Sequence, residues 1–533
     1  MSTSVSIPSH ASTQALRRAN IISDVLPLYF VIINIKIKRI TVTLMSFQIA
    51  ISLPFLTLVS SAILITSLTS QAEKTDRLPN IILIMTDDLG YAELGCYGQQ
   101  KIQTPHIDEL AREGMRFTQF YSGSAVCAPA RCNLLTGRHG GHAYIRDNGE
   151  IKNANPDRFG GQTPLPATMP NIAKTLKAGG YATGCFGKWG LGAQGTTGDP
   201  LNQGFDEFYG YNCQRNAHNL YPKYLEDNDG IHELTGNTRG RTGEQYAPQL
   251  IADRVMKFVQ ENKDKPFFLY YPTVIPHLPL QVPDKDLQQY LGKWPDTAYR
   301  GNSYLAHDTP KACYAAMISF MDRQVGRLHS LLKELKLDQN TIILFTSDNG
   351  TSFLKQQVDY TFFNSVGKLR GLKGELYEGG IRVPMIVNWP GKVPPGSVSD
   401  HLGAHYDLPA TLAAIAGTRF DDQSDGISLL PLLGGSLDAS ATEQQSHEFL
   451  FWDFAGYGGQ TAVRMGKWKG IQRTLKKNPN AALQLYNLDK DISEQHNVAN
   501  DHPKVVAKLK NIIQHERRIP ELKRFRFGKY GAQ

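Results

Sequence analysis

Two segments that lie far apart in the sequence share one plan, and this plan restricts the fold more than any other feature. Residues 81–88 read IILIMTDD and residues 342–349 read IILFTSDN. Each begins with a run that is apolar on both faces, which is typical of a buried strand in a parallel sheet. Each then ends in two consecutive oxygen-bearing side chains. Because ligands bind beyond the carboxyl ends of strands in open parallel sheets, the pattern predicts one shared site at these ends.

The chain beyond about residue 78 alternates short apolar runs with amphipathic stretches of helical spacing. This alternation predicts an α/β fold with a large, mostly parallel sheet flanked by helices. The expected strands cover 80–85, 181–186, 267–271, 341–345 and 383–388. The expected helices begin at Thr104-Pro105 and cover 169–178, 244–262 and 312–336.

The character of the sequence changes after Gly434, where short strands and turns replace the long alternation. We expect a smaller C-terminal α+β domain with an antiparallel sheet, and a boundary near 436–446. Its expected strands cover 449–454, 462–469 and 483–488, and a helix over about 503–517 follows. The predicted division is therefore a catalytic domain over 76–440 and a C-terminal subdomain over 441–533.

Residues 1–72 are predicted to be an N-terminal extension and signal peptide. Residues 49–68 are apolar and uncharged, cationic residues precede them, and small residues lead to Ala72, where we expect cleavage. This leader predicts an exported protein, periplasmic or secreted. An uncleaved membrane anchor is the alternative, because about 20 apolar residues can span a bilayer. Pro54 favours cleavage, and Met45 is an alternative start of the chain.

Composition excludes several classes of protein. The chain is 41% hydrophobic and 20% charged, which is typical of a globular enzyme. Its formal net charge is +8, but no dense run of Lys and Arg predicts nucleic-acid binding. The six cysteines contain no CxxC pair of the kind that binds zinc. Export makes one or two disulfides possible, but six cysteines in a chain of this length do not predict a disulfide framework.

The two strand ends together carry three carboxylates and one amide, from Asp87, Asp88, Asp348 and Asn349. Carboxylates held at one site repel one another unless a cation neutralises them. Oxygen ligands of this kind favour a hard cation, Ca²⁺ or Mg²⁺, over zinc. A single such end would be read as a turn capped by Asp or Asn. Two matching ends favour a metal site.

A cysteine motif lies between the two strand ends. Cys127-Ala128-Pro129-Ala130-Arg131 runs directly into Cys132-Asn133-Leu134-Leu135-Thr136-Gly137-Arg138. Pro129 suits the first turn of a helix, where the dipole favours an anion. A buried cysteine at a helix start is the purely structural interpretation of the motif.

Taken together, these blocks resemble the type I, formylglycine-dependent sulfatases of the alkaline-phosphatase-like superfamily, over about residues 79–503. The similarity extends through matching blocks in the order that the family shows. They are Thr86-Asp87-Asp88-Leu89-Gly90, the cysteine motif, Gly187-Lys188-Trp189, Pro276-His277, Ser347-Asp348-Asn349-Gly350, and Gly371-Leu372-Lys373 with Glu378-Gly379-Gly380. A terminal block, Leu485-Tyr486-Asn487-Leu488 followed by Glu494, is also similar.

The resemblance implies that a dedicated maturation enzyme oxidises Cys127 to formylglycine, whose hydrate is the nucleophile. It implies one Ca²⁺ ion, with Mg²⁺ as the alternative, bound by Asp87, Asp88, Asp348, Asn349 and residue 127. The catalytic residues that it implies are Cys127, Arg131, Lys188, His277 and Lys373. In this scheme the two lysines bind sulfate oxygens. Arg131 stabilises the hydrate, and His277 gives a proton to the leaving oxygen.

One position departs from the family pattern. Many members have histidine two residues after the lysine, and the resemblance assigns that histidine to the expulsion of sulfate. This chain has Gly190 there, in Lys188-Trp189-Gly190. His139 and His142, which follow the cysteine motif, are candidate substitutes.

The resemblance predicts hydrolysis of sulfate monoesters, with a sulfated glycan as the favoured substrate and small aryl sulfates as artificial ones. Two polar clusters are candidates for binding sugar hydroxyls: His142, Arg146 and Asn148, and Gln214, Arg215 and His218. A phosphonate or phosphate-ester hydrolase of the same superfamily is one alternative function. An inactive, exported glycan-binding relative is another. A membrane partner is expected only if the N-terminal segment is not cleaved.

Overall fold

The computed structural model describes residues 77–152, 158–352, 358–434 and 443–531. The predicted signal peptide, its cleavage site and Met45 lie outside the described residues. From Asp76 onward the chain forms one compact unit, and the predicted domain division within it stays a prediction. In the described part of the chain, no helix has both the length and the apolar character needed to cross a membrane.

A ten-stranded sheet forms the centre of this unit. In spatial order its strands are β11 (Ser397–Ser399), β2 (Met115–Phe117), β10 (Met385–Asn388), β9 (Thr341–Ser347), β1 (Asn80–Asp87), β8 (Phe267–Pro276), β4 (Ala182–Lys188), β5 (Glu207–Tyr211), β6 (Tyr224–Asp227) and β7 (Gly230–Glu233). The central strands β9, β1, β8, β4 and β5 pair in parallel, while β10, β6 and β7 run antiparallel to their neighbours. A separate parallel pair joins β3 (Phe120–Tyr121) and β12 (Gly403–Ala404). The predicted α/β class is confirmed.

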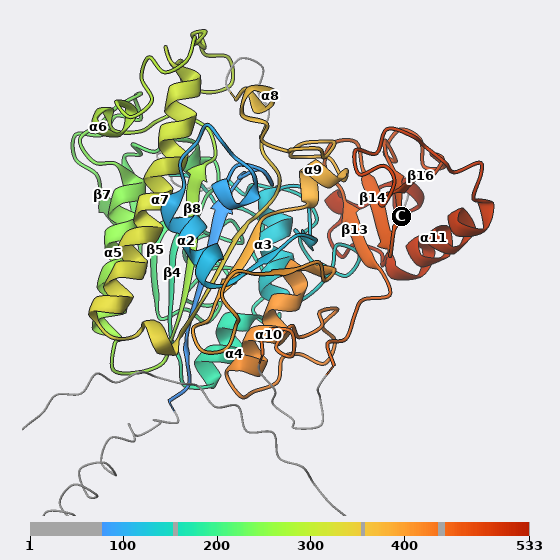
Figure 1. Ribbon diagram of the computed structural model, residues 1–533, viewed down its shortest axis with the longest axis horizontal. Helices are drawn as coiled ribbons and strands as arrows, with labels where there is room; N and C mark the ends of the chain where they lie inside the picture. The colour runs from blue at the N-terminus through green and yellow to red at the C-terminus, as the bar shows by residue number, and fades with distance from the viewer. Residues whose placement is uncertain (1–76, 153–157, 353–357, 435–442, 532–533) are drawn as a thin grey trace, which may run out of the picture. The chain divides into compact units, whose positions relative to one another are not determined.

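Helices cover both faces of the sheet (Figure 1). One face carries α2 (Pro105–Glu113), α5 (Ala247–Glu261) and α7 (Pro310–Glu334), and the other carries α3 (Cys127–Thr136), α4 (Ile172–Ala178) and α10 (Leu408–Ile415). Short helices are α6 (Asp284–Leu287), α8 (Tyr360–Phe363) and α9 (Glu378–Ile381). Successive side chains of a strand point to opposite faces. Accordingly, Ile82 and Ile84 pack with the first group of helices, and Ile81, Leu83 and Met85 pack with the second.

Some boundaries differ from the predicted ones for local reasons. The helix expected from residue 169 begins at Ile172, because Asn171 caps it by accepting a hydrogen bond from the Lys174 amide. Strand β8 continues to Pro276, five residues past its predicted end. This extension places His277 directly after the strand. All six cysteines are free thiols, so none of the disulfides that export would permit is formed.

The C-terminal region forms a four-stranded antiparallel sheet of β13 (Leu450–Phe454), β14 (Gln460–Met465), β15 (Trp468–Gln472) and β16 (Gln484–Asn487). Helix α11 (Pro503–Glu516) packs on it through Leu509, Ile512 and Ile513. The antiparallel sheet and the closing helix are as predicted. The single strand expected over 462–469 is instead a hairpin, because Gly466 has a φ of +53° and turns the chain between β14 and β15.

Candidate active site

The predicted site residues converge at one edge of the large sheet. Strands β1 and β9 pair in parallel with Thr86 opposite Ser347, so the side chains that follow the two strands lie level. The amide of Asp348 donates to the carbonyl of Thr86 at 2.9 Å and fixes this alignment. Four other elements bring the remaining catalytic residues to the same edge. They are strand β4 with Lys188, strand β8 with His277 after it, the first turn of α3 with Cys127 and Arg131, and the loop at Lys373.

The four oxygen-bearing residues of the strand ends are buried, and three of them are hydrogen-bonded to one another. The amide of Asp88 donates to Asp348 Oδ1 at 3.1 Å, and Asn349 Nδ2 donates to Asp88 Oδ1 at 2.7 Å. Asp88 has a φ of +64°, which turns its side chain back toward the site. Ser352 also donates to Asp88 Oδ2.

Cys127 is the first residue of α3 and is only 1% exposed. Its Sγ lies 3.4 Å from Asp87 Oδ1 and 3.4 Å from Lys188 Nζ. The next amide of the helix, from Ala128, donates to Asn148 Oδ1 at 2.9 Å. Burial is the main reason why the pKa of the Cys127 thiol is raised, and the charge of Asp87 adds to the effect. The unmodified side chain is therefore a neutral thiol.

Arg131, one helical turn after Cys127, is completely buried and connects several strand ends. Its Nη2 donates to Asp348 Oδ2 at 2.8 Å and lies 3.7 Å from Asp87 Oδ2. Its Nη1 donates to the carbonyl of Lys188 at 2.5 Å. Burial would lower the pKa of Arg131, but the charges of Asp348 and Asp87 hold it above the usual value.

Two lysines neutralise the neighbouring carboxylates. Lys188 Nζ donates to Asp87 Oδ2 at 2.6 Å, and Lys373 Nζ lies 2.8 Å from Asp88 Oδ1. Burial would lower the pKa of each lysine, but its aspartate partner raises it above the usual value. Burial would likewise raise the pKa of Asp87, but the charge of Lys188 holds it well below its usual range. Both pairs are therefore ionised.

His277 faces the same carboxylates with one defined nitrogen. Its Nδ1 lies 2.6 Å from the carbonyl of Leu278, so Nδ1 carries the proton and donates. Its Nε2 lies 3.6 Å from Asp88 Oδ2. The ring of His218 stacks on it with centroids 4.9 Å apart. Burial, reinforced by the charge of Lys373, lowers the pKa of His277 to about 4.

The residues present fit a hard cation. Ligand atoms of Asp87, Asp88, Cys127 and His277 lie within 4.8 Å of one another and all four residues are buried. Asn349 Oδ1 is also buried and has no hydrogen-bond partner among the described residues. Such an atom costs free energy unless something binds it. A cation with oxygen ligands would satisfy Asn349 Oδ1 and balance the surrounding carboxylates.

The structure brings together every predicted metal-ligating and catalytic residue, but not the two candidate histidines. His139 and His142 follow the far end of α3, a helix of ten residues and therefore about 15 Å long. There His142 Nδ1 lies 2.8 Å from Asp425 Oδ1, and His139 Nε2 lies 3.3 Å from Glu516 Oε2.

Of the two polar clusters predicted to bind sugar hydroxyls, only some members lie at the site. Asn148 and His218 lie at the site, through Ala128 and His277 respectively. Gln214 lies beside Gly190, since a Cβ added to that glycine would be 2.7 Å from Gln214 Nε2. By contrast, Arg146 binds Asp453 and Arg215 binds Glu150. Ser352 was missed by the sequence reasoning, and only its place shortly after Asn349 could have indicated it.

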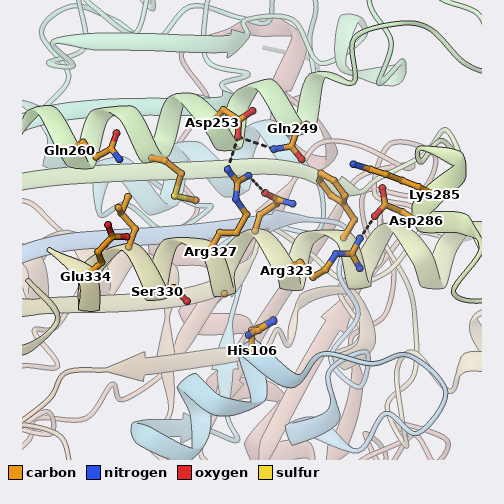
Figure 2. A pocket seen from close by; sticks show the side chains of 15 residues that line it. His106, Gln249, Asp253, Gln260, Lys285, Asp286, Arg323, Arg327, Ser330 and Glu334 are labelled. Carbon is orange, nitrogen blue, oxygen red and sulfur yellow. Dashed lines mark hydrogen bonds and ion pairs between the residues drawn. The ribbon is translucent and has the colours of Figure 1, made fainter. Parts of the chain in front are cut away.

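A cavity of about 980 Å³ between α5 and α7 is lined by none of these residues (Figure 2). Its two arginines each pair with an aspartate of the lining, Arg327 with Asp253 at 2.8 Å and Arg323 with Asp286. The converging carboxylates, lysines and histidine at the strand ends are the better candidate for a site of chemistry.

Known families match this chain over most of its described length. The family described as Sulfatase matches residues 79–418, and the one described as N-sulphoglucosamine sulphohydrolase, C-terminal, matches residues 372–519. N-acetylgalactosamine-6-sulfatase from Sus scrofa is 33% identical over 409 residues, which are 73% of this chain and 71% of that protein. Arylsulfatase A from Homo sapiens is 33% identical over 481 residues, which are 82% of this chain and 87% of that protein.

Solved structures share the fold. One, described as Ps i-CgsB in complex with k-i-k-neocarrahexaose, is similar with a TM-score of 0.68 and 29% identity. The match covers 86% of this chain and 96% of that one.

Proposed function

This chain belongs to the sulfatase family of sulfate-ester hydrolases, and we propose that it cleaves sulfate monoesters of carbohydrates with a formylglycine formed from Cys127. The observation that carries the proposal is the place of Cys127. Cys127 begins helix α3, and its Sγ lies within 3.4 Å of both Asp87 and Lys188. A nucleophile at this place would meet both a cation and a sulfate group.

The metal ligands that we propose are Asp87, Asp88, Asp348, Asn349 and residue 127, with Ca²⁺ as the first choice and Mg²⁺ as the second. The unpartnered Asn349 Oδ1 and the buried carboxylates support this set. When bound, the ion would supply Lewis acidity toward a sulfate oxygen and the formylglycine hydrate.

The chain's own residues would then position and move protons. Lys188 and Lys373 would bind sulfate oxygens and neutralise the charge that grows as the S–O bond breaks. Arg131, which binds Asp348, would stabilise the formylglycine hydrate. His277, whose Nε2 faces the site, would give a proton to the departing alcohol oxygen from its doubly protonated form, which its lowered pKa makes the minor form near neutral pH, and Lys373 would assist.

The reaction that these groups support has two steps. One hydroxyl of the formylglycine hydrate attacks sulfur, the ester S–O bond breaks and the alcohol leaves with its proton. The second hydroxyl then loses its proton, the aldehyde forms again and sulfate departs. His139 and His142 lie at the far end of α3, so the base for this second step is not one of them. Gln214, beside Gly190, is the nearest polar side chain to the position of the family histidine.

The substrate class is also part of the proposal. One relative is named an N-acetylgalactosamine-6-sulfatase, and the similar solved structure contains a neocarrahexaose. These names favour a sulfated galactose or N-acetylgalactosamine for this chain, with aryl sulfates as artificial substrates. The apolar N-terminal segment supports export to the periplasm or outside the cell, and we propose that the protein acts there.

Two measurements test this function. Mass spectrometry of the tryptic peptide that contains residue 127, from protein made in its native host, should show the aldehyde in place of the thiol. The same protein should hydrolyse 4-nitrophenyl sulfate faster than the matching phosphate diester or phosphonate. The reverse ranking would favour the phosphonate or phosphate-ester hydrolase. Binding of sulfated glycans without turnover by fully modified protein would favour the inactive relative.

A further inference from the structure

Tyr457 is the most exposed large hydrophobic side chain of the described residues, at 67% of its surface. It lies in the tight connection between β13 and β14, in the sequence Ala455-Gly456-Tyr457-Gly458-Gly459. Its φ is +49°, in the left-handed region, where a residue with a side chain is strained. A bulky aromatic residue that is both strained and exposed calls for an explanation outside the folded core.

The backbone around Tyr457 is fixed rather than loose. The amide of Gly459 donates to the carbonyl of Gly456 at 2.9 Å, and the amide of Ala455 donates to the carbonyl of Arg146 at 3.0 Å. The ring itself is tilted against Phe454, with centroids 5.9 Å apart. Tyr457 is therefore presented in a defined position.

That position is the rim of the active site. A Cβ added to Gly374 would lie 2.7 Å from Tyr457 Cε1, so the edge of the ring packs on the backbone next to Lys373. Gln460, from the same hairpin, donates to the carbonyl of Gly374 at 2.7 Å. The amide of Gly374 in turn donates to the carbonyl of Ala125 at 2.8 Å, two residues before Cys127.

The charges of the site also influence the pKa of the Tyr457 hydroxyl. Local burial of that group raises its pKa, and Lys373, Asp88 and Cys127 are the next largest influences on it. A Cβ added to Gly374 would also lie 2.9 Å from Tyr457 Cζ, so the hydroxyl end of the ring lies beside the backbone next to Lys373, while much of the ring stays open to solvent.

We infer that Tyr457 forms an aromatic subsite on which the pyranose ring of the sulfated substrate stacks when its sulfate lies between Lys188 and Lys373. The inference rests on the proposed function, and it adds a residue that contacts the sugar ring rather than the sulfate group. Aromatic rings are rigid, largely apolar platforms that lose little entropy when they bind, and the flanking glycines leave room for a ligand.

The test separates binding of the sugar from binding of sulfate. Tyr457→Ala, Tyr457→Phe and Tyr457→Gly would be compared with Val398→Ala, which changes another exposed hydrophobic residue, on β11, at 57% exposure. The Ala and Gly variants should raise KM for the best sulfated galactose or N-acetylgalactosamine oligosaccharide about tenfold, which corresponds to about 1.4 kcal/mol. The Phe variant and Val398→Ala should stay within about twofold of the parent.

Inhibition by inorganic sulfate supplies the second readout. Its inhibition constant should be unchanged in every variant, because sulfate alone does not reach the ring. An unchanged KM in Tyr457→Ala, or an equal weakening of oligosaccharide and inorganic sulfate, would overturn the inference while leaving the proposed function intact. A parent enzyme that hydrolyses 4-nitrophenyl sulfate but no sulfated sugar would overturn the stacking role as well. A parent enzyme inactive toward every sulfate ester would overturn both.

Discussion

Lys469 Nζ of strand β15 lies 2.8 Å from Glu378 Oε1, at the first residue of α9, and both side chains are completely buried. Glu494 completes the group, since its Oε1 lies 3.2 Å from Lys469 Nζ and its Oε2 accepts from the Glu378 amide at 2.7 Å. The carbonyl of Glu494 accepts from Arg370. The C-terminal region therefore holds both ends of the loop that carries Lys373, Glu378 through Lys469 of the sheet and Arg370 through Glu494 beyond it.

Replacing Lys469 should be costly, because it leaves two buried carboxylates without their shared cation. We expect Lys469→Met to lower the free energy of unfolding by about 3–5 kcal/mol. Arg419→Ala is the control, since Arg419 pairs with Asp422 where both side chains are more than four-fifths exposed, at 88% and 83%. That change should cost less than about 1 kcal/mol. Urea denaturation of both variants measures the difference, and similar losses would contradict the buried network.

Removing the cation should destabilise the protein through the strand-end carboxylates. At a Ca²⁺ concentration of one hundred times Kd, the free energy of unfolding should be about 2.7 kcal/mol higher than in chelator. The Asn349→Ala variant, which lacks the unpartnered Oδ1, should show a smaller difference at the same Ca²⁺ concentration. A parent protein whose unfolding is the same with and without chelator would argue against the site. Titration with Mg²⁺ distinguishes the two ions.

Loss of His277 should matter more for poor leaving groups than for good ones. A general acid contributes about 10²–10⁴-fold to a rate. We therefore expect His277→Ala to lower kcat by that factor on a sugar sulfate. The loss on 4-nitrophenyl sulfate should be much smaller, because nitrophenolate leaves without protonation. Equal losses on both substrates would assign His277 to another role.

The contact between Gly190 and Gln214 can be measured by comparing two glycines. Gly190 has a φ of +78° and Gly195 has a φ of +76°, so alanine is strained at both. Only at Gly190 does the new Cβ meet a buried side chain, 2.7 Å from Gln214 Nε2, whereas at Gly195 it meets open space. Gly195→Ala should cost about 1–2 kcal/mol.

Gly190→Ala should cost more than Gly195→Ala, because Gln214 must also move. The extra loss, on the order of 0.5–1 kcal/mol, should disappear in the Gln214→Ala background. Equilibrium unfolding of the four proteins in this cycle, with Gly195→Ala alongside, gives the coupling energy. A coupling energy of zero would mean that the Gln214 side chain moves aside without a cost in the free energy of unfolding.

Stability should also depend on pH through His447, whose Nε2 lies 2.7 Å from Asp407 Oδ1. Burial alone would lower the pKa of His447, but the charge and hydrogen bond of Asp407 raise it above its usual value of about 6.5. A raised pKa in the folded state stabilises the protein below the unfolded pKa, and this contribution is lost as pH rises through the folded pKa.

The difference in unfolding free energy between the parent and His447→Gln should therefore be largest near pH 6 and should shrink as the pH rises above about 6.5. His496→Gln serves as the control, because that histidine is 83% exposed. A difference in unfolding free energy that grows with pH would show that folding does not raise the pKa of His447.

Much of the site could be predicted because its residues are set by strand ends. Asp87 and Asp348 follow two strands that pair in parallel, so their meeting requires only the sheet. Lys188 ends a third strand of the same sheet. Tyr457 and Ser352 could not be found this way, because they reach the site through a hairpin and a loop whose paths depend on tertiary packing.

The candidate histidines show where short sequence distance misleads. His139 is only twelve residues from Cys127, but those residues form a buried helix that separates the two. Likewise, apolar and charged residues are interleaved on both sides of Gly466 in positions 462–469, as in one continuous strand, so the pattern did not show that the chain reverses there.

The complete burial of α3 has a consequence for the life history of the molecule. All ten of its residues, Cys127 included, are shielded from solvent. The proposed maturation enzyme would therefore have to reach that thiol while the segment is still unpacked. Chains that fold before oxidation would keep an unreactive thiol. The active fraction of a preparation would therefore depend on the rate of oxidation relative to the rate of folding during synthesis.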